Sequence, residues 1–262
     1  MLTFYTFYDS FLFSMLGLAV VVFIALQFIT VAYGMTFNNR WGISIKSKWG
    51  WWLMETPVFI AILIIYGVSL YMGIKPFNVV TSFILLLFLL HYGQRSFVFP
   101  ILMKGDSKMP LSVVFFGIFF NFCNAFMQGS WLFIVCPDDM YKLNWFWSPQ
   151  FIIGIVVFFF GMIINLHSDR IIRQLRKSKD DNNYYLPKGF FFERINSSNY
   201  FGELLEWLGF AILTWSFAGF VFFCWAFANL VPRAKAVYFR YSHFFGERFN
   251  QLNRWKIFPY IY

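Results

Sequence analysis

The stretch ELLEWLGFAILTWSFAGFVFFCWAFANLVP, residues 203–232, decides how often this chain crosses a membrane. It could form one long tilted helix, or two shorter helices that meet near SFAGF at 216–220. Because roughly 20 helical residues cross a hydrocarbon core of about 30 Å, length alone allows both. Other apolar stretches predict five further spans, at about 11–33, 51–72, 77–103, 109–135 and 148–166.

The distribution of Lys and Arg favours two helices in this stretch, because short cytoplasmic loops of membrane proteins collect positive charge. With seven spans, 18 of the 21 basic residues fall on one side, in segments 35–50, 104–108, 167–200 and after 232. The other side holds only Lys75 and Lys142. We therefore expect an all-α, polytopic membrane protein with seven transmembrane helices, its N-terminus outside and its C-terminus in the cytoplasm.

Composition agrees with a membrane protein. Hydrophobic residues make up 60% of the chain and charged residues 13%, with a mean hydropathy of +0.61, which leaves too little polar surface for a soluble globule. The first span has no basic n-region or cleavage site, so we expect it to be retained. The net charge of +9 is explained by the loops and does not indicate nucleic acid. Neither the three cysteines nor the three histidines form a metal-binding pattern, so no metal is expected.

Polar side chains inside the predicted spans gather at the cytoplasmic side. An ionisable group in lipid is costly, so each is by default a functional candidate that faces the bundle interior. Counting about 1.5 Å per helical residue from the span ends places most of them in the cytoplasmic half of the spans, with Asn121 and Asn124 near mid-depth. They are Glu55, His91, Tyr92, Arg95, Asn121, Asn124, Asn165, His167, Ser168, Asp169, Glu203 and Glu206, with Gln128 farther out and Tyr238 and Tyr241 ending the last span. This pattern predicts one pocket that opens to the cytoplasm.

The segment NLHSDRIIRQLRK, 165–177, continues the fifth span into a basic helix. Basic residues recur along one predicted face: Arg170, Arg173, and Arg176 or Lys177. Paired guanidinium groups fit phosphate oxygens, but such a stripe can also set topology or contact acidic lipids. Carboxylates and an amide lie beside the stripe: Asn165, Asp169, Glu203 and Glu206. Topology and lipid headgroups do not require carboxylates there, whereas a ribose or a nicotinamide amide does, so these neighbours favour a phosphate-binding role for the stripe.

Glu55 and Tyr92 are predicted at the same depth in neighbouring spans. A buried carboxylate beside a phenol can orient the hydroxyl toward a substrate carbonyl and stabilise the oxyanion that develops there. The alternative interpretation is a hydrogen bond that only joins two helices.

Three segments resemble the C-terminal signature of the steroid 5-alpha-reductase family: NLHSDRIIRQLRK, LPKGFFF at 186–192 and NYFGELLEWLGF at 199–210. The resemblance extends to WWLMETP at 51–57, LHYGQRSFVFP at 90–100 and the terminal IFPYIY. Members of that family are membrane enzymes that reduce the enone double bond of 3-oxo-4-ene steroids with NADPH.

The resemblance implies roles for individual residues. Glu55 and Tyr92 are the expected catalytic pair that polarises the steroid 3-ketone, with Met54 beside them in the substrate site. The residues expected to bind NADPH are Arg95, Asn165, Asp169, Arg173, Arg176, Asn199 and Glu203, with Tyr241 and Arg254 in a more loosely similar tail. Residues 1–262 then form one membrane-embedded reductase domain, with about 1–135 mainly the substrate half and about 136–262 mainly the NADPH half.

Two positions and one segment depart from the family pattern. Met54 stands where steroid reductases of the family commonly have Gln, and Tyr185 stands where Arg is usual. MKGDSKMP at 103–110 lacks the expected Asn and Arg. We therefore expect altered substrate contacts and a weaker preference for the 2'-phosphate of NADPH.

The function expected from the resemblance is NADPH-dependent reduction of 3-oxo-4-ene steroids to 5-alpha-steroids. The apolar substrate would enter from the bilayer of a bacterial inner membrane or the endoplasmic reticulum, and the site would face the cytoplasm. A polyprenol or enoyl-thioester reductase would share the cofactor half. An isoprenylcysteine-type methyltransferase using S-adenosylmethionine would leave the arginines unexplained, and a receptor or transporter would not require Glu55 and Tyr92 at one level. Membrane lipids are the other expected partners, and the oligomeric state is left open.

Overall fold

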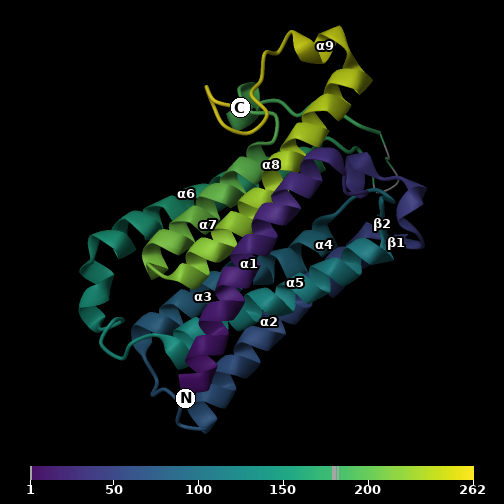
Figure 1. Cartoon of the computed structure of the whole chain (residues 1–262). Helices are drawn as coiled ribbons and strands as arrows, with labels where there is room; N and C mark the ends of the chain where they lie inside the picture. Colours follow the sequence, from purple (N-terminus) through teal and green to yellow (C-terminus); the bar gives the residue numbers. More distant parts are fainter. Residues whose placement is uncertain (1, 179–180, 182) are drawn as a thin grey trace.

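In the computed structural model, which describes residues 2–178, 181 and 183–262, long helices form a bundle (Figure 1). These helices are α1 (Leu2–Phe28), α2 (Ser47–Tyr71), α3 (Val79–Gly93), α5 (Leu111–Ser130), α6 (Pro149–Gln174), α7 (Ser198–Thr214) and α8 (Phe217–Phe245). The shorter elements are η1 (Gly34–Thr36), η2 (Asn39–Trp41), β1 (Ser44–Lys46), η3 (Gln94–Val98), α4 (Phe99–Leu102), β2 (Lys108–Pro110), η4 (Trp131–Val135), η5 (Leu143–Trp147), η6 (Phe190–Glu193) and α9 (Glu247–Asn250).

Six of the described helices are long and apolar enough to cross a membrane, so a multi-pass membrane protein is confirmed. They are α1, α2, the continuous α3–η3–α4 helix, α5 with η4, α6 and α8. The predicted break in 203–232 is also present: α7 ends at Thr214, Trp215 is left-handed, and the Ser216 hydroxyl caps α8 by accepting from the Gly219 amide. Because α7 has only 17 residues, its membrane crossing stays a prediction. The two termini lie at opposite ends of the bundle (Figure 1).

Four glycines bring α6 and α7 into the most extensive helix contact of the molecule. They are Gly154 and Gly161 on α6 and Gly202 and Gly209 on α7. A Cβ atom at Gly202 would lie 2.4 Å from the Asn165 backbone nitrogen, so the two backbones touch directly. Small residues allow this approach in membrane helices, where packing rather than hydrophobicity drives association. The contact sets polar side chains of α6 against those of α7.

Two other helix pairs complete the frame. α2 packs on α5, where Met54 fills the space above Gly117, and α1 packs on α8, where the Trp225 indole donates to the Met15 carbonyl at 2.9 Å. The antiparallel β1–β2 pair links the starts of α2 and α5. These strands were not predicted, because each has three residues and forms only by pairing with a distant partner. The all-α prediction holds for the rest of the frame.

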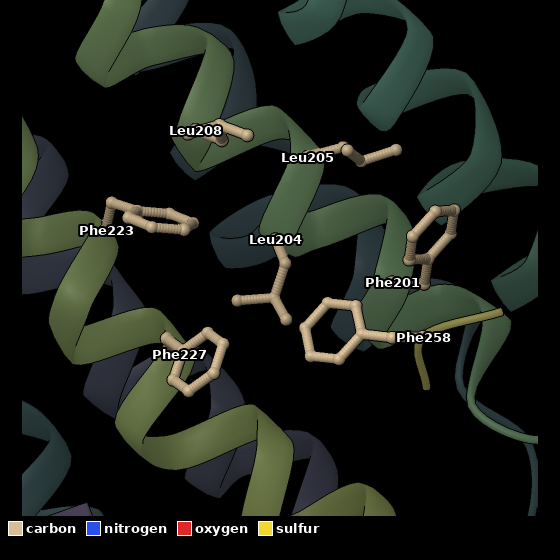
Figure 2. A pocket seen from close by; sticks show the side chains of 7 residues that line it. All are labelled: Phe201, Leu204, Leu205, Leu208, Phe223, Phe227 and Phe258. Carbon is tan, nitrogen blue, oxygen red and sulfur yellow. The ribbon is translucent and has the colours of Figure 1, made fainter. Parts of the chain in front are cut away.

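The C-terminal segment folds back onto α7 and α8. Asn196 donates its backbone N–H to the Trp255 carbonyl at 2.8 Å. Figure 2 shows Phe258 of this segment beside Phe201 and Leu204 of α7, at an apolar pocket of about 100 Å³ that Phe227 of α8 also lines. Ligand sites usually measure about 300–1,000 Å³, so this pocket is too small for a steroid or a dinucleotide.

Candidate functional site

One cavity of about 670 Å³ lies among α1, α2, α3 with η3, α5, α6, α7 and α8. This is the size of a typical small-molecule site. Part of its wall is apolar, with Met15, Leu18, Phe116, Phe120 and Trp225 among its members. The rest of the wall carries the predicted site residues Met54, Glu55, Tyr92, Arg95, Asp169, Asn199 and Glu203. Helix depth had predicted Glu55, Tyr92, Arg95, Asp169 and Glu203 for the pocket, whereas Met54 and Asn199 were implied by the resemblance.

Arg95 is the central cation of the polar wall. It lies in η3, a π-helical turn of the kind often found at functional sites. Its Nη1 is 3.5 Å from Asp169 Oδ2, and its guanidinium lies 4.5 Å from the Trp51 ring centre and 4.6 Å from that of Phe99. Aromatic faces and a carboxylate together compensate a buried charge that would otherwise be costly in a membrane.

The predicted amide and carboxylate residues meet across the α6–α7 contact. The Asn199 amide donates to Asp169 Oδ1 at 3.1 Å. The Asn165 amide donates to the Asn199 carbonyl at 2.9 Å and reaches Glu203 Oε2 at 3.5 Å. Asp169, Asn199 and Glu203 line the cavity, whereas Asn165 supports them from behind. This arrangement offers several hydrogen-bond acceptors to a bound hydroxyl or amide group.

Glu55 and Tyr92 line the same cavity, but each is hydrogen-bonded to a different asparagine of α5. Asn121 donates to Glu55 Oε2 at 3.3 Å, and its amide also reaches the Met54 carbonyl. Asn124 donates to the Tyr92 hydroxyl oxygen at 2.8 Å. The sequence had marked both asparagines as polar residues near mid-depth without assigning them a partner. The catalytic candidates are thus held by α5, which the resemblance did not imply.

The predicted arginines differ in their surroundings. Arg173 Nη1 is fully buried without a hydrogen-bond partner among the described residues, as are Nε and Nη1 of Arg254. Burial lowers the pKa of Arg254, against the opposing effect of Glu193. Arg176 donates to the Lys104 carbonyl and interacts electrostatically with Tyr241. Because buried donors are rarely left unpaired, these guanidinium nitrogens are suited to bind an anion, although Asp169 and Glu193 already interact electrostatically with Arg173 and Arg254.

The single basic stripe predicted on α6 was wrong. Arg173 and Arg176 are half-buried, whereas Arg170 and Lys177 are exposed. The regular helix ends at Gln174, so Lys177 no longer follows the helical period, and Arg170 lies on the face turned away from the bundle. Of the four basic residues predicted for the stripe, Arg173 on α6 and Arg176 just beyond its end are the two that are half-buried.

Arg233 of α8 is a site residue that the sequence analysis missed. Its Nη2 donates to the Tyr33 carbonyl at 2.9 Å, its Nε donates to the Tyr200 hydroxyl at 3.1 Å, and its guanidinium lies 3.4 Å from the Tyr33 ring centre. Burial raises the pKa of Tyr33 to about 12, against the opposing effect of Arg233. Arg233 thereby holds the segment after α1 against the cavity. No motif around Arg233 indicated this role.

His91 and Glu206 were predicted for the pocket, but their pairing was not. His91 Nδ1 lies 2.8 Å from Glu206 Oε1, and both side chains are buried. The His91 ring packs against Trp207 with ring centres 4.4 Å apart. His91 and Trp207 also line the cavity, so the pair joins α3 to α7 beside Tyr92.

Comparison with known proteins decides the family. The family model for 3-oxo-5-alpha-steroid 4-dehydrogenase matches residues 107–262. The chain belongs to this family. It is 32% identical over 245 residues to steroid 5-alpha-reductase DET2 of Arabidopsis thaliana, an alignment covering 91% of this chain and 90% of the relative. It is 36% identical over 226 residues to 3-oxo-5-alpha-steroid 4-dehydrogenase 1 of Mus musculus, covering 83% of each.

Membership of the 3-oxo-5-alpha-steroid 4-dehydrogenase family confirms the resemblance seen in the motifs. The matched segment begins after Glu55 and Tyr92, but an alignment covering 91% of the chain must extend well upstream of it. The protein is thus a multi-pass membrane oxidoreductase of this family. The roles of individual site residues stay predictions.

Proposed function

We propose that this protein reduces the 4,5 double bond of 3-oxo-4-ene steroids with NADPH, giving 5-alpha-steroids. The observation that carries the proposal is the single cavity in which an apolar wall meets Tyr92, Glu55 and the Arg95–Asp169 pair. Such a cavity suits a large apolar molecule with one polar end. Membership of the family and the names of the relatives support the reaction class.

Tyr92 is the proposed electrophile for the steroid 3-ketone. Reduction at the carbon beta to the ketone places negative charge on the ketone oxygen, and a hydroxyl directed at that oxygen stabilises the resulting enolate. Glu55, positioned by Asn121, lies in the same wall and interacts electrostatically with Tyr92. Met54 is the proposed substrate contact beside them. Protonation at the alpha carbon then completes the saturation.

The residues proposed to hold NADPH fit its chemistry. One guanidinium nitrogen of Arg173 and two of Arg254 are buried without a hydrogen-bond partner in the described part of the chain, which suits phosphate oxygens. Asp169, Asn199 and Glu203 offer acceptors for ribose hydroxyls or the nicotinamide amide, with Arg95 and Asn165 beside them. Arg176 and Tyr241, which interact electrostatically with each other, are proposed to join Arg254 at the phosphates. When bound, NADPH supplies the hydride. The unpaired guanidinium groups favour a phosphate-bearing cofactor over S-adenosylmethionine.

The proposed substrate route runs from the bilayer. Several apolar residues of the cavity wall are also open to the outer surface: Leu18 is 45% exposed and Phe116 is 70% exposed. We place seven spans with the N-terminus outside, so that Arg173 and Arg254 face the cytoplasm, where NADPH is available. The charge distribution of the loops and the opposite positions of the two termini support this orientation (Figure 1).

The test compares two matched steroids on detergent-purified protein. NADPH oxidation should require a 3-oxo-4-ene steroid such as testosterone, and the analogue with a 3-hydroxyl in place of the ketone should not support it. NADPH binding without steroid reduction would keep the cofactor site and redirect the search to polyprenols and enoyl thioesters. Folded protein that neither binds NADPH nor reduces the steroid would contradict the proposal.

A further inference from the structure

The hydrogen bond between Asn124 and Tyr92 has a defined direction. The Asn124 amide nitrogen lies 2.8 Å from the Tyr92 hydroxyl oxygen. An amide nitrogen carries protons and cannot accept, so the tyrosine oxygen is the acceptor. Asn124 therefore leaves the Tyr92 hydroxyl proton free for another partner.

Gln128 fixes which end of the Asn124 amide faces Tyr92. Gln128 Nε2 donates to the Ala218 carbonyl at 3.0 Å, and a carbonyl can only accept. The same Nε2 lies 3.5 Å from Asn124 Oδ1. Rotating the Asn124 amide by half a turn would set two NH₂ groups against each other and turn its oxygen to Tyr92. The orientation is therefore determined by neighbours rather than by Tyr92 itself.

Both amides are enclosed in the bundle. Asn124 is 0% exposed and Gln128 is 1% exposed, and they lie one turn apart on α5. Tyr92 is 4% exposed and lines the cavity. Among the described residues Asn124 is the hydrogen-bond partner of the Tyr92 hydroxyl. The cavity is consequently the direction in which the tyrosine proton can be donated.

We propose that Asn124 is a positioning residue that keeps the Tyr92 hydroxyl proton directed into the cavity, and that Gln128 holds Asn124 in the required orientation. The inference rests on the proposed function, in which the ketone oxygen of the steroid accepts the hydrogen bond from Tyr92. It adds a reason for substrate class: the cavity presents a hydrogen-bond donor at Tyr92, which suits a carbonyl.

The decisive variant is Asn124→Asp, which keeps the side-chain shape and reverses the hydrogen bond. A carboxylate only accepts, so it would take the tyrosine proton away from the substrate. We expect kcat to fall by roughly 100-fold, the order seen when an oxyanion donor is lost, with the KM for NADPH unchanged. Lowering the pH should restore activity relative to wild type, because a protonated Asp can donate to Tyr92 again.

The charged groups that act on Tyr92 are the same in both proteins, so the difference between the two pH profiles reports the introduced carboxyl group. They are Glu55 on α2, Glu203 on α7 and Arg95 on η3, together with the titratable His91 of α3, whose ring centre lies 5.0 Å from that of Tyr92. Asn38→Asp, at an exposed loop position, controls for an added carboxylate and should leave activity and its pH profile unchanged.

A binding measurement gives a readout without turnover. Trp207 and Trp225 line the cavity, so their fluorescence can follow steroid binding in the absence of NADPH. Asn124→Asp should bind a 3-oxo steroid about 10-fold more weakly than the wild-type protein does, which corresponds to the loss of roughly one hydrogen bond. For the analogue without the 3-oxygen, the variant and the wild-type protein should have the same affinity. If the variant binds the 3-oxo steroid with the same affinity as the wild-type protein, the proposal is overturned.

Two further variants separate the possible failures. Gln128→Glu should turn the Asn124 amide and lower kcat without touching Tyr92, which keeps the proposal testable if Asn124→Asp does not fold. Tyr92→Phe tests the proposed function: full activity there would remove Tyr92 from the chemistry. If Tyr92→Phe is inactive while Asn124→Asp and Gln128→Glu keep the wild-type kcat and pH profile, the positioning role alone is wrong.

Discussion

A Cβ atom placed on Gly161 would lie 2.3 Å from the backbone nitrogen of Glu206, so α6 and α7 are in backbone contact beside the cavity. This contact sets the spacing between Asn165 and Asp169 on α6 and Asn199 and Glu203 on α7. The polar wall of the cavity therefore depends on residues that carry no functional group. The glycines thus determine how closely the polar side chains of α6 and α7 approach each other.

Gly161→Ala should strongly destabilise the folded protein. The added methyl meets backbone atoms of α7, which cannot move aside as a side chain can, so the destabilisation should exceed the usual ~1–3 kcal/mol of core overpacking. Gly67→Ala on α2 is the matched control, because nothing lies within 4 Å of its Cβ position. Thermal unfolding in detergent measures both, and equal stability of the two variants would refute the backbone contact.

Arg173→Ala should weaken NADPH binding by about 2–3 kcal/mol, the size of a charge-assisted hydrogen bond that is lost. Arg170→Ala removes the same charge three residues earlier on the exposed face of α6 and should leave the affinity unchanged. Isothermal titration of both variants with NADPH distinguishes a phosphate contact from a general effect of charge. Equal weakening in both would return Arg173 to a topological role.

Loss of one partner from the His91–Glu206 pair should cost more stability than loss of both. Glu206→Leu or His91→Leu leaves a buried polar group without its partner, which typically costs about 3–5 kcal/mol for buried ion pairs. The double variant removes both groups and should recover part of that loss. The free energy of unfolding of the wild-type protein, the two single variants and the double variant forms a double-mutant cycle. Strictly additive losses of stability would show that the two side chains do not interact.

The sequence was sufficient for the features that follow from hydropathy and charge. The helix break at Ser216 was predictable because only two helices put the basic tail with the other basic loops. The convergence of Arg95, Asp169 and Glu203 was predictable because depth in a membrane can be counted along each helix. The family motifs pointed to the same residues.

Hydrogen-bond partners were less accessible to sequence reasoning, because they depend on helix rotation and side-chain direction. Asn121 and Asn124 were placed near mid-depth, yet their hydrogen bonds depend on how α5 packs: Asn121 bonds to Glu55 on α2, and Asn124 bonds to Tyr92 on α3. Arg233 was counted only as a charge in the tail, although it contacts Tyr33 from the far end of the chain. Arg170 was grouped with Arg173 by a helical period that could not show which face turns outward.

The most direct test of the central claim follows the hydrogen that reaches the steroid. Purified protein would receive testosterone and NADPH deuterated at both C4 positions, and the product would be analysed by mass spectrometry and NMR. We predict a saturated 5-alpha product with one deuterium at the carbon beta to the ketone, and a roughly 100- to 1,000-fold lower rate for Tyr92→Phe. Unchanged steroid in the presence of folded, NADPH-binding protein, or deuterium at the ketone carbon instead, would contradict the account.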